Sequence, residues 1–172
     1  PKIFSAGGRF GYEDDGETPN TIAIFHDYGH ARLVFEVRGL PEKSDADKMG
    51  NYRGASIGLV VDCENGSMVI TSYSQGKAFD KEGKVIREFS GEASHYENFI
   101  QAVRSRKPSD LNGEVLEGHL SSALCHTGNL SYQLGRRLRP EEIREQVQGD
   151  AVALETCQRA YEHLQANGVD LE

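Results

Sequence analysis

The sequence has no long apolar run and few cysteines. No stretch approaches the roughly 18 residues that a bilayer-spanning helix needs, and no signal peptide is visible. The three cysteines, Cys63, Cys125 and Cys157, lie far apart and match no zinc or disulfide pattern. We therefore expect reduced thiols that are buried as small hydrophobic residues in a cytoplasmic protein, with an export signal upstream of Pro1 left open.

Several motifs of catalysis and cofactor binding are also absent. The chain contains no G-x-S-x-G, no Walker loop, no cysteine–histidine pairing motif and no acidic metal cluster. The run Gly7–Gly11 superficially resembles a phosphate loop, but a dinucleotide loop needs G-x-G-x-x-G between a strand and a helix. Here the acidic stretch Glu13–Asp15 follows and would repel phosphate. We interpret these glycines as turn glycines and expect no nucleotide site.

The composition is that of an ordinary globular protein. The chain has 172 residues, 37% of them hydrophobic, and a length of this order suits one domain with a real core. Its net charge is -8, from 19 basic and 27 acidic side chains. An acidic balance argues against a nucleic acid or an anionic membrane surface as the partner.

The first half, residues 1–90, has the pattern of β-hairpins. Asn65-Gly66 is the strongest turn signal between two of the runs. The charged stretch Pro41–Arg53 between the first two hairpins is predicted to be a loop that orders only against a partner. The predicted strand pairs are Thr21–Asp27 with Arg32–Arg38, Ser56–Cys63 with Ser67–Tyr73, and Lys77–Asp80 with Lys84–Phe89.

The second half, residues 91–172, has the pattern of helices. Ser94 and Glu97 have the spacing of a capping box, and Pro108 closes the helix that follows. The remaining predicted helices run from a cap at Asn112 to Gly135, from Pro140 over a short segment, and from a cap at Asp150 to Gly168.

These elements predict a single α+β domain over residues 1–172. We expect an open, mainly antiparallel sheet with helices packed on one face. The strand Thr21–Asp27 is apolar on both sides, so its second face is predicted to meet another domain or subunit. An edge strand covered by a loop is the alternative.

The histidines are weak candidates for a metal site. His119 and His126 are seven residues apart on one predicted helix, about 10 Å along its axis, which is too far to share an ion. His26 and His30 have the closer spacing, but they bracket a turn. His119 lies within an apolar stripe, so its imidazole should find a partner or open onto a pocket. A capped or surface role is the alternative for each histidine.

Four segments together carry a family resemblance: G-G-R-F-G-Y (Gly7–Tyr12), F-E-V-R-G-L-P (Phe35–Pro41), H-Y-E-N-F-I-Q-A-V-R-S-R-K-P-S-D-L-N (His95–Asn112) and E-G-H-L-S-S-A-L-C-H-T-G-N-L-S-Y-Q-L-G-R (Glu117–Arg136). In this order they resemble the C-terminal part of the Gfo/Idh/MocA oxidoreductases, the family of glucose–fructose oxidoreductase and inositol dehydrogenase. The likeness covers roughly residues 1–139, whereas residues 140–172 match less clearly.

This resemblance implies an enzyme in two parts. In that family an N-terminal Rossmann domain binds NAD or NADP, and the C-terminal domain shapes the substrate pocket and forms the subunit interface through its sheet face. The family's catalytic lysine lies in an E-K-P motif that is missing here, because Glu42-Lys43 is followed by Ser44. We therefore expect no catalytic residue and no bound cofactor in this chain, with the dinucleotide-binding domain lying outside it.

The leading hypothesis is the substrate-pocket and oligomerisation domain of an NAD(P)-dependent dehydrogenase for a sugar, polyol or related hydroxy compound. The chain alone would be inactive, and a homo-oligomer would form through the sheet face. A non-catalytic carbohydrate-binding or assembly module is the alternative, and a glycoside hydrolase or lyase using transient oxidation is a weaker one. NAD versus NADP and dimer versus tetramer stay open. Five polar residues beside predicted apolar packing are the substrate-contact candidates: Arg9, Tyr12, Arg38, His119 and His126.

Overall fold

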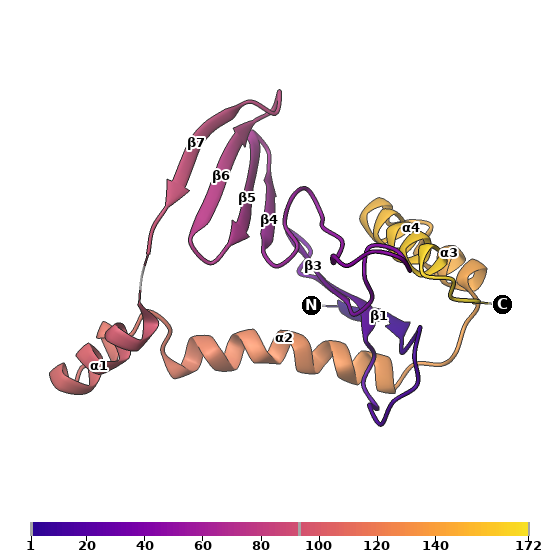
Figure 1. Ribbon diagram of the computed structural model, residues 1–172, viewed down its shortest axis with the longest axis horizontal. Coiled ribbons are helices and arrows are strands. Elements are labelled where there is room, and N and C mark those ends of the chain that lie inside the picture. Colours follow the sequence, from indigo (N-terminus) through magenta and orange to yellow (C-terminus); the bar gives the residue numbers. More distant parts are fainter. Residues whose placement is uncertain (1, 93, 172) are drawn as a thin grey trace. The chain divides into compact units, whose positions relative to one another are not determined.

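The computed structural model describes residues 2–92 and 94–171 and confirms the α+β class (Figure 1). All described strands precede residue 91, and all described helices follow it. The chain forms two compact units. The first unit comprises residues 1–50 and 120–172, and the second comprises residues 51–119. Each unit is described by itself below.

The first unit contains a three-stranded antiparallel sheet in the order β1-β2-β3, with bounds Lys2–Gly8, Thr21–Asp27 and Arg32–Arg38. The hairpin of β2 and β3 was predicted and is confirmed, whereas β1 was missed because its glycines had been interpreted as a turn. Gly7 lies within β1, and the closeness of β2 explains why this strand position holds a glycine. A Cβ built on Gly7 would lie 2.3 Å from the Thr21 carbonyl oxygen. Only glycine permits this approach of two backbones.

Two helices cover one face of this sheet, α3 (Pro140–Val147) and α4 (Ala151–Ala166). The core there combines Ala23 and Phe25 of β2 with Val147 and Ala153, all nearly inaccessible to solvent. Burial of such apolar area is the main stabilising contribution to folding.

The opposite face of the same sheet is also covered. Ser5 Oγ donates a hydrogen bond to the Gly128 carbonyl of α2 (Val115–Gln133) at 3.2 Å. A Cβ on Gly128 would lie 2.2 Å from Ile24 Cδ1, so this part of α2 packs directly on β2. Helices thus lie on both faces of the sheet, and every residue from Thr21 to His26 is buried. The prediction that β2 leaves one face for another subunit is therefore wrong.

The second unit contains a four-stranded antiparallel sheet in the order β4-β5-β6-β7 (Figure 1). The two further hairpins were predicted, but the turn at Tyr73-Ser74 joins them into one sheet. The strands therefore fall into two sheets rather than one. The bounds are β4 Leu59–Cys63, β5 Gly66–Ser72, β6 Gln75–Asp80 and β7 Val85–Ser90.

The helix α1 (His95–Ser105) follows in the second unit. Its predicted cap is confirmed, because the Ser94 hydroxyl accepts a hydrogen bond from the Glu97 N–H at 3.1 Å. Such a bond satisfies one of the donors that a helix start leaves free. The helix ends where Arg106 adopts a left-handed conformation with φ 59.

A short 3-10 turn, η1 (Pro108–Asp110), is tied back onto α1. Asn98 donates to the Asp110 carbonyl at 2.7 Å and accepts from the Asn112 N–H at 3.0 Å. Asn112 therefore fixes this turn and does not cap α2, contrary to the prediction. The Glu114 carboxylate accepts from the Leu116 N–H at the start of α2 instead.

The C-terminal signals agree with the structure. Pro140 is the first residue of α3, and the Asp150 carboxylate caps α4 by accepting from the N–H groups of Val152 and Ala153.

The loop after β3 was expected to order only against a partner. Its first part is held by α4 instead, since the Ser44 N–H donates to the Ala166 carbonyl at 3.1 Å.

Across residues 2–92 and 94–171, no helix has the length and apolar character needed to cross a membrane.

Candidate functional site

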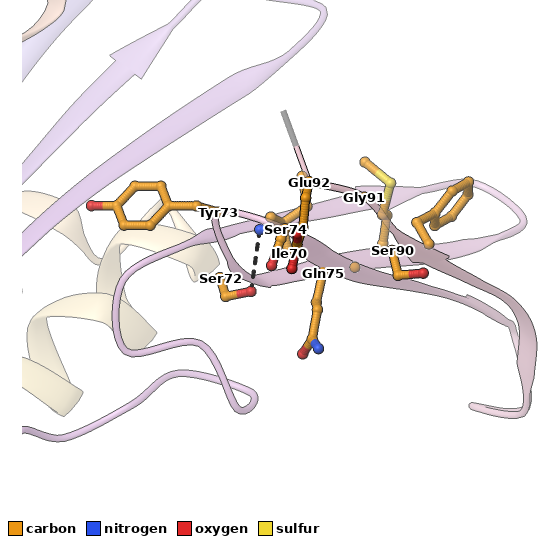
Figure 2. A pocket seen from close by; sticks show the side chains of 11 residues that line it. Ile70, Ser72, Tyr73, Ser74, Gln75, Ser90, Gly91 and Glu92 are labelled. Atoms are coloured by element: carbon orange, nitrogen blue, oxygen red, sulfur yellow. Dashed lines mark hydrogen bonds between the residues drawn. The ribbon is translucent and has the colours of Figure 1, made fainter. Parts of the chain in front are cut away.

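A shallow hollow of about 430 Å³ lies on the four-stranded sheet (Figure 2). The strand register aligns Ile70, Gly76 and Phe89 in one row across β5, β6 and β7. Gly76 has no side chain, so the row is depressed between its two large neighbours. A Cβ built on Gly76 would lie 3.5 Å from Ile70 Cγ1, which is an ordinary contact. The hollow therefore exists because a glycine occupies the middle strand.

The rim of the hollow is polar although its floor is apolar. Met68, Ile70 and Phe89 supply the apolar floor. The Ser72 hydroxyl accepts a hydrogen bond from the Ser74 N–H at 3.3 Å, which closes the turn beside the hollow (Figure 2). The polar residues that line the hollow are Ser72, Ser74, Gln75, Ser90 and Glu92. The side chains of Gln75 and Ser90 lie on the other face of the sheet, because these residues alternate with Gly76 and Phe89.

Hydroxyl and carboxylate groups around an apolar floor suit a polyhydroxylated ligand. Such a ligand presents C–H faces to the floor and hydroxyl groups to the rim. The volume of the hollow lies within the usual range of small-molecule sites, about 300–1,000 Å³. Tyr73 extends away from Ser90 and Gly91 in Figure 2 and is fully exposed. On β7 the Arg87 guanidinium lies over the Phe89 ring, 4.8 Å from the ring centroid, which places a positive charge beside the floor.

Two of the five predicted contact residues lie together in the first unit. The Arg9 guanidinium lies over the Tyr12 ring at 5.5 Å. Arg9 also donates from Nε to Asp14 at 2.7 Å and from Nη1 to the Thr18 carbonyl at 2.9 Å. The Arg9 hydrogen bond is the main reason why the pKa of Asp14 is lowered. Arg9 therefore holds its own loop in shape.

Arg38 belongs to a cluster of charges between β3 and α4. Its guanidinium donates to Glu36 at 2.7 Å, and Arg159 donates to the same carboxylate at 2.8 and 3.0 Å. Burial would raise the pKa of Glu36, but the hydrogen bonds from Arg159 and Arg38 outweigh burial and lower it. The carboxylate is thus ionised and already paired. This cluster joins a strand to a helix, and no local sequence pattern marks Arg159 or Glu36 as partners.

The two histidines of α2 are both exposed. His119 lies in the second unit and His126 in the first. Leu116 and Leu120 flank His119 and are each 54% exposed, so the apolar stripe around it is open rather than a closed pocket. Of the five predicted residues, the described part of the structure brings only Arg9 and Tyr12 into contact.

Two other histidines are buried, His26, which the sequence had raised only for its spacing from His30, and His163, which it had not singled out. His26 is 1% exposed on the α2 side of β2, and neither ring nitrogen has a hydrogen-bond partner. Burial lowers its pKa. His163 on α4 is 7% exposed; burial and then the charge of Arg38 lower its pKa. Both rings are therefore neutral core side chains at neutral pH.

The structure offers no metal site within residues 2–92 and 94–171, since no three potential ligands lie close enough together. His30 is exposed at the turn, so it forms no pair with the buried His26. All three cysteines are free, as predicted. Cys63 is exposed, which contradicts its predicted burial, whereas Cys157 is half-buried and burial raises the pKa of its thiol.

Comparison with known proteins gives one partial likeness. Centrin-binding protein SFI1 of Toxoplasma gondii is 39% identical over 70 residues, which are 41% of this chain and 2% of that protein. The chain thus spans about 2% of the length of the curated relative that it matches. No family model matches the chain. No solved structure matches it.

Proposed function

We propose that the chain is the substrate-pocket and oligomerisation domain of a cytoplasmic NAD(P)-dependent oxidoreductase acting on a sugar, polyol or related hydroxy compound. The observation that carries the proposal is the hollow around Gly76, with its apolar floor and its rim of hydroxyl and carboxylate groups. A site of this composition can hold a hydroxy compound. The family resemblance of residues 1–139 supports the same assignment.

In this proposal the chemistry is divided between two domains. An N-terminal domain outside this chain binds NAD or NADP and carries the lysine that exchanges the hydroxyl proton. A nicotinamide bound by that domain would exchange a hydride with the substrate carbon, and the lysine would exchange the proton of the substrate hydroxyl. This chain contributes pocket wall and subunit contacts, and it has no turnover by itself.

The amount of uncovered surface supports a role in assembly. The chain exposes 12835 Å². Two separate compact domains with the lengths of its two units would together expose about 10,000 Å². In the second unit the excess includes large apolar side chains, and patches of this kind usually mark an interface. The most exposed of these are Ile57, Tyr73, Ile86, Tyr96, Phe99 and Val115.

A non-catalytic carbohydrate-binding module is the second candidate, because the same hollow would serve it. The two functions differ in their need for a nicotinamide. A module would bind a sugar without any redox partner, whereas the oxidoreductase domain acts only together with a nucleotide-binding domain.

Steady-state kinetics of the complete reading frame that encodes this chain test the proposal. We expect nicotinamide reduction with a panel of sugars and polyols, and none by the 172-residue chain alone. Glu92→Ala should raise KM several-fold because a rim carboxylate is lost, while Lys81→Ala in the exposed β6–β7 turn should leave KM unchanged. A reading frame without nicotinamide-dependent turnover, whose product still binds a sugar, would instead identify the module.

A further inference from the structure

The helix α1 presents an uncovered apolar face. Tyr96, Phe99, Ile100 and Val103 are 73%, 61%, 48% and 44% exposed. Their spacing of three and four residues places them on one side of the helix. Ala102 is the buried residue of α1, and the bonds of Asn98 attach the helix to η1 on another side. The four side chains therefore form a continuous stripe, here called the α1 stripe.

We propose that the α1 stripe packs antiparallel against the α1 stripe of a second copy of this chain. This inference rests on the oligomerisation role proposed above and assigns that role to a specific surface. A two-fold axis between Phe99 and Ile100 places Tyr96 against the partner's Val103. It also places Phe99 against the partner's Ile100. Each contact then joins an aromatic ring to a β-branched side chain, which is the self-complementarity that a two-fold interface requires.

The charges beside the stripe select the antiparallel direction. Glu97 and Arg104 are seven residues apart, so they lie on the same flank of the helix, about 20° from each other in direction. Within the described chain neither side chain has an ion-pair partner. In the antiparallel pair Glu97 comes within about 3 Å, along the axis, of the level of the partner's Arg104. A parallel two-fold pair would instead place the two charged flanks on opposite sides of the seam, so Glu97 could not reach the partner's Arg104.

The size of the stripe predicts a modest affinity. Each aromatic side chain can bury about 150–250 Å², so covering both stripes removes on the order of 1,000 Å² from water. Specific stable interfaces start at about 1,200 Å² in total. We therefore expect a dimer that dissociates in the micromolar range, helped by two symmetric ion pairs and by the opposed helix dipoles.

Sedimentation velocity of the 172-residue chain over a range of concentrations tests this dimer. We expect a concentration-dependent shift from monomer to dimer. Glu97→Arg should raise the dissociation constant about tenfold or more, because it replaces both ion pairs with repulsion. Glu97→Arg combined with Arg104→Glu should restore the dimer with its charges exchanged. Glu82→Arg, the same charge reversal in the exposed β6–β7 turn, is the matched control and should leave dimerisation unchanged.

The outcomes separate the possible occupants of the stripe. A chain that stays monomeric, or a dimer that is insensitive to Glu97→Arg, overturns the proposal and assigns the stripe to another domain or partner. Failure of the double variant to restore the dimer also overturns it, because the charge pairing would then be absent. None of the residues that line the hollow belongs to α1, so the kinetic test of the proposed function is read independently.

Discussion

Arg159 donates two hydrogen bonds to the Glu36 carboxylate, Nη1 to Oε2 at 3.0 Å and Nη2 to Oε1 at 2.8 Å. The two residues are 123 positions apart in the sequence, and each side chain is 21% exposed. The pair therefore joins α4 to β3 across a mostly buried interface. A bidentate pair of this kind fixes orientation as well as adding stability.

Glu36→Gln should weaken the attachment of α4. The amide keeps the shape but loses the charge that balances two guanidinium groups, so we expect the free energy of unfolding to fall by about 1–2 kcal/mol. Denaturant unfolding followed by circular dichroism measures this change. Glu17→Gln, in the exposed loop after β1, is the control and should have little effect.

The same carboxylate makes the protein sensitive to acid. Because the pKa of Glu36 in the folded state lies below its ordinary value of 4.5, its contribution is present above pH 4.5 and is lost as the pH falls further. The wild-type protein should lose stability in that range more steeply than the Glu36→Gln variant. Equal slopes would contradict the pairing.

His26 should make stability depend on pH in a higher range. The unfolded chain binds a proton near pH 6.5, whereas burial lowers the pKa of the folded imidazole. The contribution is therefore complete above pH 6.5 and falls below it, by at most about 1.4 kcal/mol per pH unit. Unfolding curves between pH 7.5 and 5 should show a smaller slope for His26→Leu. His30→Gln at the exposed turn should keep the wild-type slope, and identical slopes for all three proteins would refute the assignment.

Two glycines of α2 form a matched pair. A Cβ on Gly128 would meet Ile24, whereas nothing lies within 4 Å of a Cβ on Gly118. We expect Gly128→Ala to destabilise the protein by about 1–3 kcal/mol through overpacking. Gly118→Ala should stabilise it by up to about 1 kcal/mol through helix propensity. A Gly128→Ala variant as stable as wild type would mean that α2 does not pack on β2.

Gly76→Val should fill the hollow without unfolding the sheet. The added Cβ makes ordinary contacts, and a β-branched side chain suits a strand. The kcat/KM of the complete enzyme should fall at least about tenfold, since an apolar branch occupies the space for the ligand. Lys77→Thr on the other face of β6 is the control, and equal losses in both variants would remove the hollow from the site.

Local sequence patterns predicted the elements that depend on neighbours in the chain. The alternation in β3 and the caps at Ser94 and Asp150 were correct because each involves residues within a few positions. The strand β1 was missed because Gly7 normally marks a turn. Its role as a close-approach site becomes visible only when β2 is placed beside it.

Long-range packing could not be predicted in the same way. The apolar character of β2 correctly indicated burial on both faces, but it does not say which protein provides the cover. Here α2 and the pair α3 and α4 provide it. The hollow was missed because the alignment of Ile70, Gly76 and Phe89 follows from the register of three strands. Among the predicted contact residues, Arg9 and Tyr12 contact each other because they lie three positions apart in one loop.

Transfer of deuterium from substrate to nicotinamide tests the central claim most directly. A sugar or polyol deuterated at the reacting carbon is incubated with NAD or NADP and the product of the complete reading frame, and the nicotinamide is analysed by mass spectrometry. We predict one deuterium on the reduced nicotinamide, and none when the 172-residue chain is used alone. Turnover by the 172-residue chain without nicotinamide, or product formation by the complete protein without label transfer, would contradict the account.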